Sequence, residues 1–151
     1  MLCGHHARAP MATIGVFAII IDRERRILCV RLNYSHGGWT TPGGRVEPGE
    51  LPTVALCREV KEETGYVIEV GPLIGTYAKS YADDIVLNFE AQIIGRREWS
   101  PNAEIAEVRF FPENELPDAI SPVARQRIED GFRGVRGVFR EYKNVPVNEA
   151  T

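Results

Sequence analysis

The sequence has few cysteines and no long apolar run, and each shortage excludes a class of protein. Its three cysteines, Cys3, Cys29 and Cys57, are odd in number and contain no CxxC pair, which argues against a disulfide framework and a zinc ribbon. The longest apolar run, residues 14–21, is far too short to span a bilayer, and the N-terminus lacks the charged-then-apolar order of a signal peptide. We therefore expect a soluble, cytoplasmic protein with no membrane contact.

An excess of charge of one sign is lacking as well. Eighteen basic residues stand against 21 acidic ones, so the formal charge is −3 and gives no general attraction for nucleic acid. Any anionic ligand must therefore bind at a local site. With 151 residues, 44% of them apolar, the chain has the size of one domain. We expect a flexible N-terminal arm over residues 1–12, a single domain over 13–143 and a polar tail over 144–151.

Apolar periodicity and turn residues predict the elements of this domain. Residues 14–21 and 27–32 are β-rich runs on either side of a charged segment, and we expect them to pair as an antiparallel hairpin. Pro42-Gly43-Gly44 is expected to form a turn. Strands are also predicted over residues 39–41, 67–81, 85–94 and 107–111, and a helix over 122–132.

Another helix is predicted over residues 52–64. Pro52 belongs to a residue type favoured in a first helical turn, and Gly65 to one favoured just beyond a helix end. Helical spacing gathers one set of side chains for burial, with the charges elsewhere: Leu56, Cys57, Val60 and Thr64.

Three glutamates of this helix share one face. Glu59, Glu62 and Glu63 stand at positions i, i+3 and i+4. Three like charges repel one another, whereas a hard divalent cation such as Mg²⁺ binds oxygen ligands and turns the repulsion into coordination. Taken alone, the three glutamates leave two interpretations open, a metal site and a solvated acidic helix face.

The surrounding residues resemble a known signature. Gly44, then Glu50, then the segment 58–65 (REVKEETG) are similar to the Nudix box over residues 44–66, and the glycine pair ahead of it is a common lead-in to that box. Identities at fixed spacings over this length have few chance matches. Two positions depart from the pattern: Leu51 replaces a frequent Ser or Thr N-cap, and Tyr66 replaces a bulky aliphatic residue.

The resemblance implies both a fold and a reaction. The fold class is α/β, a Nudix-type α/β/α sandwich with a central mixed sheet and the box loop-helix-loop on one face. The reaction is hydrolysis of a pyrophosphate bond in a nucleoside diphosphate linked to another group, as in a nucleoside triphosphate, a modified nucleotide or a nucleotide sugar. Members of the family use Mg²⁺, or Mn²⁺, and dimers are common among them.

The resemblance also implies roles for residues of the box. Glu59, Glu62 and Glu63 would bind the metal, with the backbone carbonyl of Gly43 assisting. Two further residues would support this set: Glu50 by bracing or joining the metal site, and Arg58 by orienting a glutamate.

The general base is left open between two places in the chain. The first choice is Glu62 in the box, and the second is Glu104 on a later loop, where the family often keeps an acidic residue. The neighbouring Glu107 could substitute for Glu104, and a solvated loop is the alternative interpretation.

Substrate contacts are less specific in the sequence. Arg31 is a candidate for a phosphate and Gly44 for a substrate contact. Aromatic candidates for stacking on a base are Trp39, Tyr34, Tyr77, Tyr81 and Phe89. Late arginines could help an RNA 5′ end to dock or form a solvated helix and tail: Arg125, Arg127, Arg133, Arg136 and Arg140. An RNA 5′-pyrophosphohydrolase and a non-catalytic nucleotide-sensing module therefore stay as alternative functions.

Overall fold

A computed structural model describes residues 11–143, so most of the predicted arm and all of the predicted tail lie outside the described residues. The elements follow in this order: β1 (Thr13–Ile19), β2 (Arg26–Leu32), η1 (Ser35–Gly37), β3 (Trp39–Thr40), β4 (Gly43–Arg45), α1 (Pro52–Thr64), β5 (Tyr66–Lys79), η2 (Ser80–Ala82), β6 (Asp84–Arg96), β7 (Ile105–Pro112), η3 (Glu113–Glu115), α2 (Pro122–Phe132) and β8 (Val138–Tyr142). Neither α1 nor α2, the helices of the described part, is long and apolar enough to cross a bilayer.

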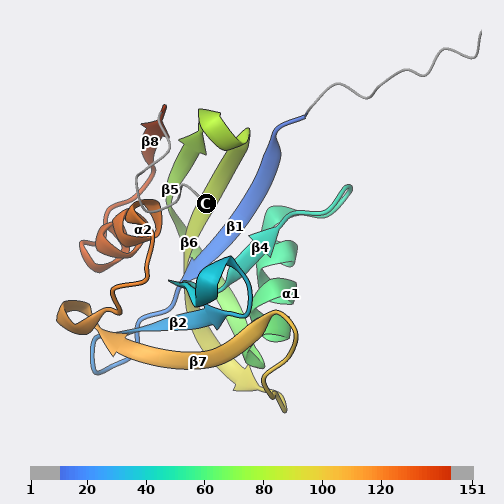
Figure 1. The fold of residues 1–151 in the computed structure, drawn as a ribbon, viewed down its shortest axis with the longest axis vertical. Coiled ribbons are helices and arrows are strands. Elements are labelled where there is room, and N and C mark those ends of the chain that lie inside the picture. The colour runs from blue at the N-terminus through green and yellow to red at the C-terminus, as the bar shows by residue number, and fades with distance from the viewer. Residues whose placement is uncertain (1–10, 144–151) are drawn as a thin grey trace, which may run out of the picture.

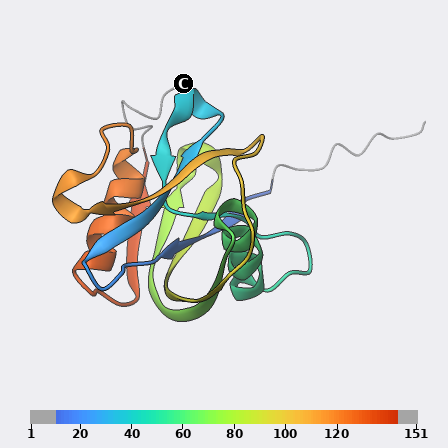
Figure 2. The ribbon, with the colours of Figure 1, turned by 90° about the horizontal axis from the view of Figure 1, so that it is seen from below.

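The strands form two sheets between two helices. The larger sheet has the order β4-β1-β6-β5-β8 and the smaller one the order β3-β2-β7. The larger sheet is mixed, since β1 runs parallel to β6 and β5 parallel to β8 while its other pairs are antiparallel. Figure 1 shows α1 and α2 on opposite sides of this sheet, with β2 and β7 crossing beneath it, and Figure 2 gives the same arrangement from below. The expected sandwich with a central mixed sheet is confirmed.

Alternation along β1 divides the core into two layers. Val16 and Ala18 are fully buried with the apolar residues of α1, whereas Ile19 is buried with those of α2. Successive side chains of a strand point to opposite faces, so one strand supplies both layers. Its apolar run therefore belongs to a central strand covered by a helix on each side.

The box helix α1 begins and ends where the sequence predicts. Pro52 is its first residue, and Gly65 follows its end in the left-handed conformation with φ 76°. Leu51 makes no side-chain cap, as expected from the missing Ser or Thr. One part of the prediction is wrong, because Glu63 is buried at 6% exposure although the charges were expected away from the buried side.

The predicted hairpin of the first two strands is also wrong for most of its length. The strands meet only near their connection, where Ile21 bridges Ile27 and the amide of Leu28 donates to the carbonyl of Ile20 at 3.0 Å. Beyond this point β1 pairs with β4 and β6, and β2 pairs with β3 and β7. Both strands carry buried side chains on both faces, so each needs its own neighbours and covering layers.

The expected turn at the glycine pair is in fact a short strand. Gly43 and Gly44 belong to β4, which pairs with β1. A Cβ at Gly43 would lie 2.1 Å from the carbonyl oxygen of Val16. Glycine is therefore needed here for close approach of two strands and not for chain reversal.

Strand β8 was not expected from the sequence. Within residues 11–143 it is a short edge strand that pairs with β5 alone, and its side chains are only half-buried or exposed. Its alternation is therefore weak, and it is held by pairing with a strand more than 60 residues earlier.

Candidate metal and nucleotide site

Two box glutamates converge on the glycine pair of β4. The Glu63 carboxylate accepts a hydrogen bond from the Gly43 amide, with 2.7 Å between Oε1 and N. The Glu59 carboxylate lies so close to Gly44 that a Cβ on this glycine would be 2.4 Å from Glu59 Cδ. The strand β4 and the helix α1 thus bring two carboxylates to one place, and the absence of side chains at both glycines makes the room for them.

The position of Glu63 makes its ionisation costly. Burial, together with the neighbouring charges of Glu59, Glu104 and Glu62, raises the pKa of Glu63 to about 8, although the hydrogen bond from Gly43 acts in the opposite direction. Burial also raises the pKa of Glu59, a shift that Arg58 opposes. At neutral pH it is therefore costly to ionise Glu63 beside Glu59 unless a cation joins the two carboxylates.

We expect the stability of the protein in EDTA to fall as the pH rises from about 4.5 to about 8. The folded-state pKa of Glu63 lies above its unfolded value of 4.5, so its contribution to the free energy of unfolding is fully present below pH 4.5. This contribution is lost as the pH rises through the folded pKa of about 8. The measurement is the melting temperature of the wild type and of Glu63→Gln across this range. Glu63→Gln cannot ionise at this position, so its melting temperature relative to that of the wild type should rise as the pH increases. A constant difference between the two proteins would contradict the prediction.

Arg58 connects the box loop to the box helix. Its guanidinium donates to both carboxylate oxygens of Glu50, at 2.8 and 2.9 Å, and to Glu59 at 2.9 Å and the carbonyl of Arg45 at 3.2 Å. The two hydrogen bonds from Arg58 to Glu50, together with one from the Glu47 amide, lower the pKa of Glu50 to about 2, so Glu50 stays ionised. The planar guanidinium fits a carboxylate in this paired geometry and orients Glu59 at the same time.

The two candidate bases lie far apart in the chain, because Glu62 stands between Glu59 and Glu63 whereas Glu104 belongs to a later loop. Glu62 has a side chain that is 55% exposed and touches Arg58 only at 3.5 Å. The charge of Glu104 contributes to the raised pKa values of Glu59 and Glu63, so its carboxylate lies close to theirs. By contrast, Glu107 is paired with Arg31 at 3.4 Å and with Arg109.

The donor set fits a hard divalent cation in kind. Carboxylate oxygens are the ligands that Mg²⁺ prefers, and the space at Gly44 lets the Glu59 carboxylate approach the backbone closely. Among residues 11–143, however, no three His, Cys, Asp or Glu side chains stand in a ready arrangement for a metal. The Glu59 and Glu63 carboxylates are instead hydrogen-bonded to Arg58 and Gly43, each through its Oε1 atom.

A cleft of about 780 Å³ opens beside these glutamates. Its lining includes Glu63, both glycines of β4 and the aromatic side chains Phe17, Tyr34 and Trp39. Trp39 and Gly44, two of the residues predicted to contact the substrate, are among those that line this cleft. Arg31 and Tyr81 are not among the lining residues, since Arg31 is engaged with Glu107 across β2 and β7, and Tyr81 lies in η2 at the end of β5. A cleft of this volume suits a small organic ligand.

Two aromatic candidates for base stacking belong to the interior. Tyr77 is fully buried and donates its hydroxyl to Asp130 at 2.7 Å. Phe89 packs against the core beneath α1. Neither side chain is among those that line the cleft.

Arg127 was named only among the late arginines, for RNA docking or a solvated helix, and not as a residue of this cleft. It lines the cleft, is only 4% exposed, lies 4.2 Å above the ring of Phe17 and donates to Thr40 at 3.3 Å. One signal could have found it: Arg127 stands one helical turn after Val123, on the apolar side of α2. A cation on a buried stripe is rare unless it has a specific task.

Comparison with known proteins relates the chain to characterised sequences. The family model described as the NUDIX domain matches residues 11–130. A Bacillus subtilis protein provisionally named an 8-oxo-dGTP diphosphatase is 32% identical over 140 residues, which cover 93% of this chain and 90% of that protein. An ADP-ribose pyrophosphatase of Methanocaldococcus jannaschii is 36% identical over 104 residues, which cover 65% of this chain and 61% of that protein.

Solved structures share the fold. A crystal structure of a NUDIX hydrolase from Nitrosomonas europaea aligns with a TM-score of 0.78 and 23% identity, covering 91% of this chain and 82% of that one. At this identity the likeness concerns the fold alone, while the family model and the B. subtilis relative carry the assignment. The chain therefore belongs to the Nudix family of hydrolases, which act on phosphorus-containing anhydrides.

Proposed function

We propose that this protein is a Mg²⁺-dependent pyrophosphohydrolase of small nucleotides, working in the cytoplasm. One observation carries the proposal: box carboxylates meet at the end of a cleft whose volume and lining suit a nucleotide. The metal would be held by Glu59, Glu62 and Glu63 with the Gly43 carbonyl, and Mn²⁺ would serve in the same place.

The placement of these groups supports the following reaction. The chemistry that Mg²⁺ supplies when bound is neutralisation of charge on the phosphoryl oxygens and acidification of the attacking water. Glu62, exposed and loosely held, takes the proton of this water as its oxygen forms a bond to phosphorus. The bridging P–O bond breaks, and its electron pair leaves with the departing phosphate. Arg58 keeps Glu59 oriented throughout, and Glu104 is the second candidate for the proton.

The nucleoside part of the substrate would occupy the cleft. Trp39 and Phe17 offer aromatic surface for a base, and Arg127 and Asp118 offer a donor and an acceptor for its polar edge. The full-length similarity to a relative named for 8-oxo-dGTP favours a nucleoside triphosphate, an oxidised one included. The similarity to an ADP-ribose pyrophosphatase makes nucleotide sugars a second class of candidate substrate.

An RNA 5′ end is a less favoured substrate. Three of the late arginines are paired with acidic groups within the fold, Arg133 with Glu129, Arg136 with Glu90 and Arg140 with Asp130. Binding along an RNA backbone depends on cations that neutralise phosphates, and paired arginines offer fewer of these. A free nucleotide needs only the cleft and the box.

The experiment is a turnover assay on a panel of substrates with Mg²⁺ or with EDTA. The panel contains ordinary and oxidised nucleoside triphosphates, nucleotide sugars, dinucleoside polyphosphates and 5′-triphosphorylated RNA. We expect Mg²⁺-dependent release of a nucleoside monophosphate or phosphate from a small nucleotide, with no turnover in EDTA.

Two other outcomes would change the assignment. Preference for triphosphorylated RNA over every free nucleotide would favour the RNA 5′-pyrophosphohydrolase. Tight nucleotide binding by well-folded protein without turnover of any substrate would favour a nucleotide-sensing module, in which the box residues are ligand contacts only.

A further inference from the structure

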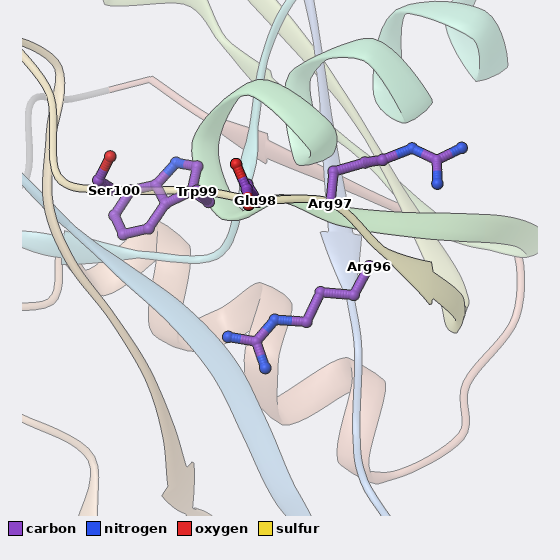
Figure 3. Close-up of a pocket in the computed structure, with 5 residues that line it drawn as sticks. All are labelled: Arg96, Arg97, Glu98, Trp99 and Ser100. Carbon is purple, nitrogen blue, oxygen red and sulfur yellow. The ribbon is translucent and has the colours of Figure 1, made fainter.

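A segment that follows β6 crosses the C-terminal end of the box helix. The indole nitrogen Nε1 of Trp99 donates to the backbone carbonyl of Glu62 at 3.1 Å. The amide of Arg97 donates to the carbonyl of Gly65 at 2.7 Å. Figure 3 shows Trp99 beside the last turn of α1 with its ring nitrogen turned toward the helix. Two hydrogen bonds therefore tie residues 97–100 to the end of this helix.

Residues 97 and 99 pack so closely on the end of the helix that only glycine fits at position 65. A Cβ at Gly65 would lie 2.7 Å from both the carbonyl oxygen of Arg97 and the Cβ of Trp99. Gly65 also has φ 76°, a backbone conformation that favours glycine. The box glycine thus serves two purposes, ending the helix and admitting Trp99.

The carbonyl that Trp99 contacts is one that the helix leaves without a partner of its own. The last four carbonyls of a helix have no intrahelical amide to accept from, and helix ends fray for this reason. Gly65 supplies its amide to the carbonyl of Lys61. Trp99 supplies the next donor, to Glu62, so the final turn is closed by a residue 37 positions later.

Glu62 depends on this turn more than its neighbours do. Its side chain is 55% exposed, and its ion-pair distance to Arg58 is 3.5 Å. Glu63, by contrast, is buried and bonded to the amide of Gly43 at 2.7 Å. The position of the Glu62 side chain therefore depends mainly on the position of its backbone.

We propose that Trp99 is a positioning residue, which holds the last turn of the box helix so that Glu62 joins the metal site. This role rests on the proposed metal-dependent function. Trp99 is not among the residues that line the cleft, and it acts through the Glu62 peptide group.

The hollow around this segment has a second interpretation, an anion site, which the geometry does not favour. Arg96 and Arg97 border it together with Trp99. Their guanidinium groups point away from each other in Figure 3, and that of Arg96 lies 5.8 Å from the ring centroid of Tyr66. An anion site needs cations that converge.

The test compares Trp99→Phe with the wild type in two measurements. The first is amide hydrogen exchange over residues 62–66 in EDTA, which reports the closing of the last turn whether or not metal binds. The second is Mn²⁺ affinity, measured from the free-ion electron paramagnetic resonance signal. We expect exchange to be faster and Mn²⁺ affinity weaker, each by about three- to tenfold, as expected for one lost hydrogen bond. Activity should fall in kcat, with the nucleotide KM within about twofold.

Two further variants make the test specific. Trp99→His places a ring N–H at the position of the indole nitrogen, because the imidazole and pyrrole rings overlay, and it should recover part of the affinity. Arg97→Gln keeps the backbone bond to Gly65 and should match the wild type. Unchanged exchange and Mn²⁺ affinity in Trp99→Phe would overturn the role of Trp99 alone. Failure of the wild type to bind Mn²⁺ would overturn the proposed function and this role with it.

Discussion

Glu62→Gln is expected to lower kcat by about a hundredfold or more while leaving the protein folded. Glutamine keeps the shape of the side chain but can neither accept the proton of the attacking water nor give a charged oxygen to the metal. The side chain is 55% exposed, so the melting temperature should change little. The measurement is steady-state turnover of the best substrate at saturating Mg²⁺, with the melting temperature recorded beside it.

A comparison with Glu104→Gln distinguishes the two candidate bases. If Glu62 is the base, kcat should fall less in Glu104→Gln than in Glu62→Gln, because the charge of Glu104 would then act only on the neighbouring carboxylates. Glu69→Gln, an exposed glutamate of β5 away from the cleft, is the matched control and should keep full activity. A larger loss in Glu104→Gln than in Glu62→Gln would move the general base to the later loop.

Asp130→Ala is expected to cost about 3 kcal/mol of the free energy of unfolding, the largest stability effect that we foresee. Asp130 is fully buried on α2 and accepts hydrogen bonds from Tyr77 at 2.7 Å, from Arg140 at 2.7 and 2.8 Å, and from Gln126 at 3.1 Å. Its loss leaves a buried hydroxyl and a guanidinium without their acceptor. For a chain of this length the melting temperature should drop by roughly 10 °C.

The control for this variant is one residue earlier on the same helix. Glu129 pairs with Arg133, and both side chains are exposed, at 44% and 65%. An exposed pair of this kind contributes little, so Glu129→Gln should change the free energy of unfolding by less than about 0.5 kcal/mol. If both substitutions lowered the free energy of unfolding equally, burial of Asp130 would not be the reason that its hydrogen bonds stabilise the fold. Because α2 also carries Arg127 into the cleft, Asp130→Ala should raise the KM for nucleotide as well.

The box helix was predictable to the residue because its signals are local. Pro52 and Gly65 mark its ends, and the spacing of the glutamates places them on one face whatever the rest of the chain does. The same holds for α2, whose predicted range of 122–132 is confirmed. Local spacing also sufficed for the family resemblance, since the whole box lies within residues 44–66.

Strand pairing was predicted less well because it depends on partners elsewhere in the chain. An apolar run indicates a strand but does not indicate which strand lies beside it, so β1 and β2 were paired with each other although they belong to different sheets. The glycine pair of β4 was taken for a turn because glycine is typical both of turns and of close backbone approach. Only the neighbouring β1 decides between the two.

The sequence by itself indicated the family and the reaction class and supplied the candidate oxygen donors, because all of these depend on residue types at fixed short spacings. Tertiary structure alone decided how those donors are held. The bond from Gly43 to Glu63 spans 20 residues, the bond from Trp99 to Glu62 spans 37, and Arg127 reaches Thr40 across 87. Burial and long-range hydrogen bonds arise only when distant segments pack together, and they set which carboxylate is costly to ionise, which is exposed and which cation faces the cleft.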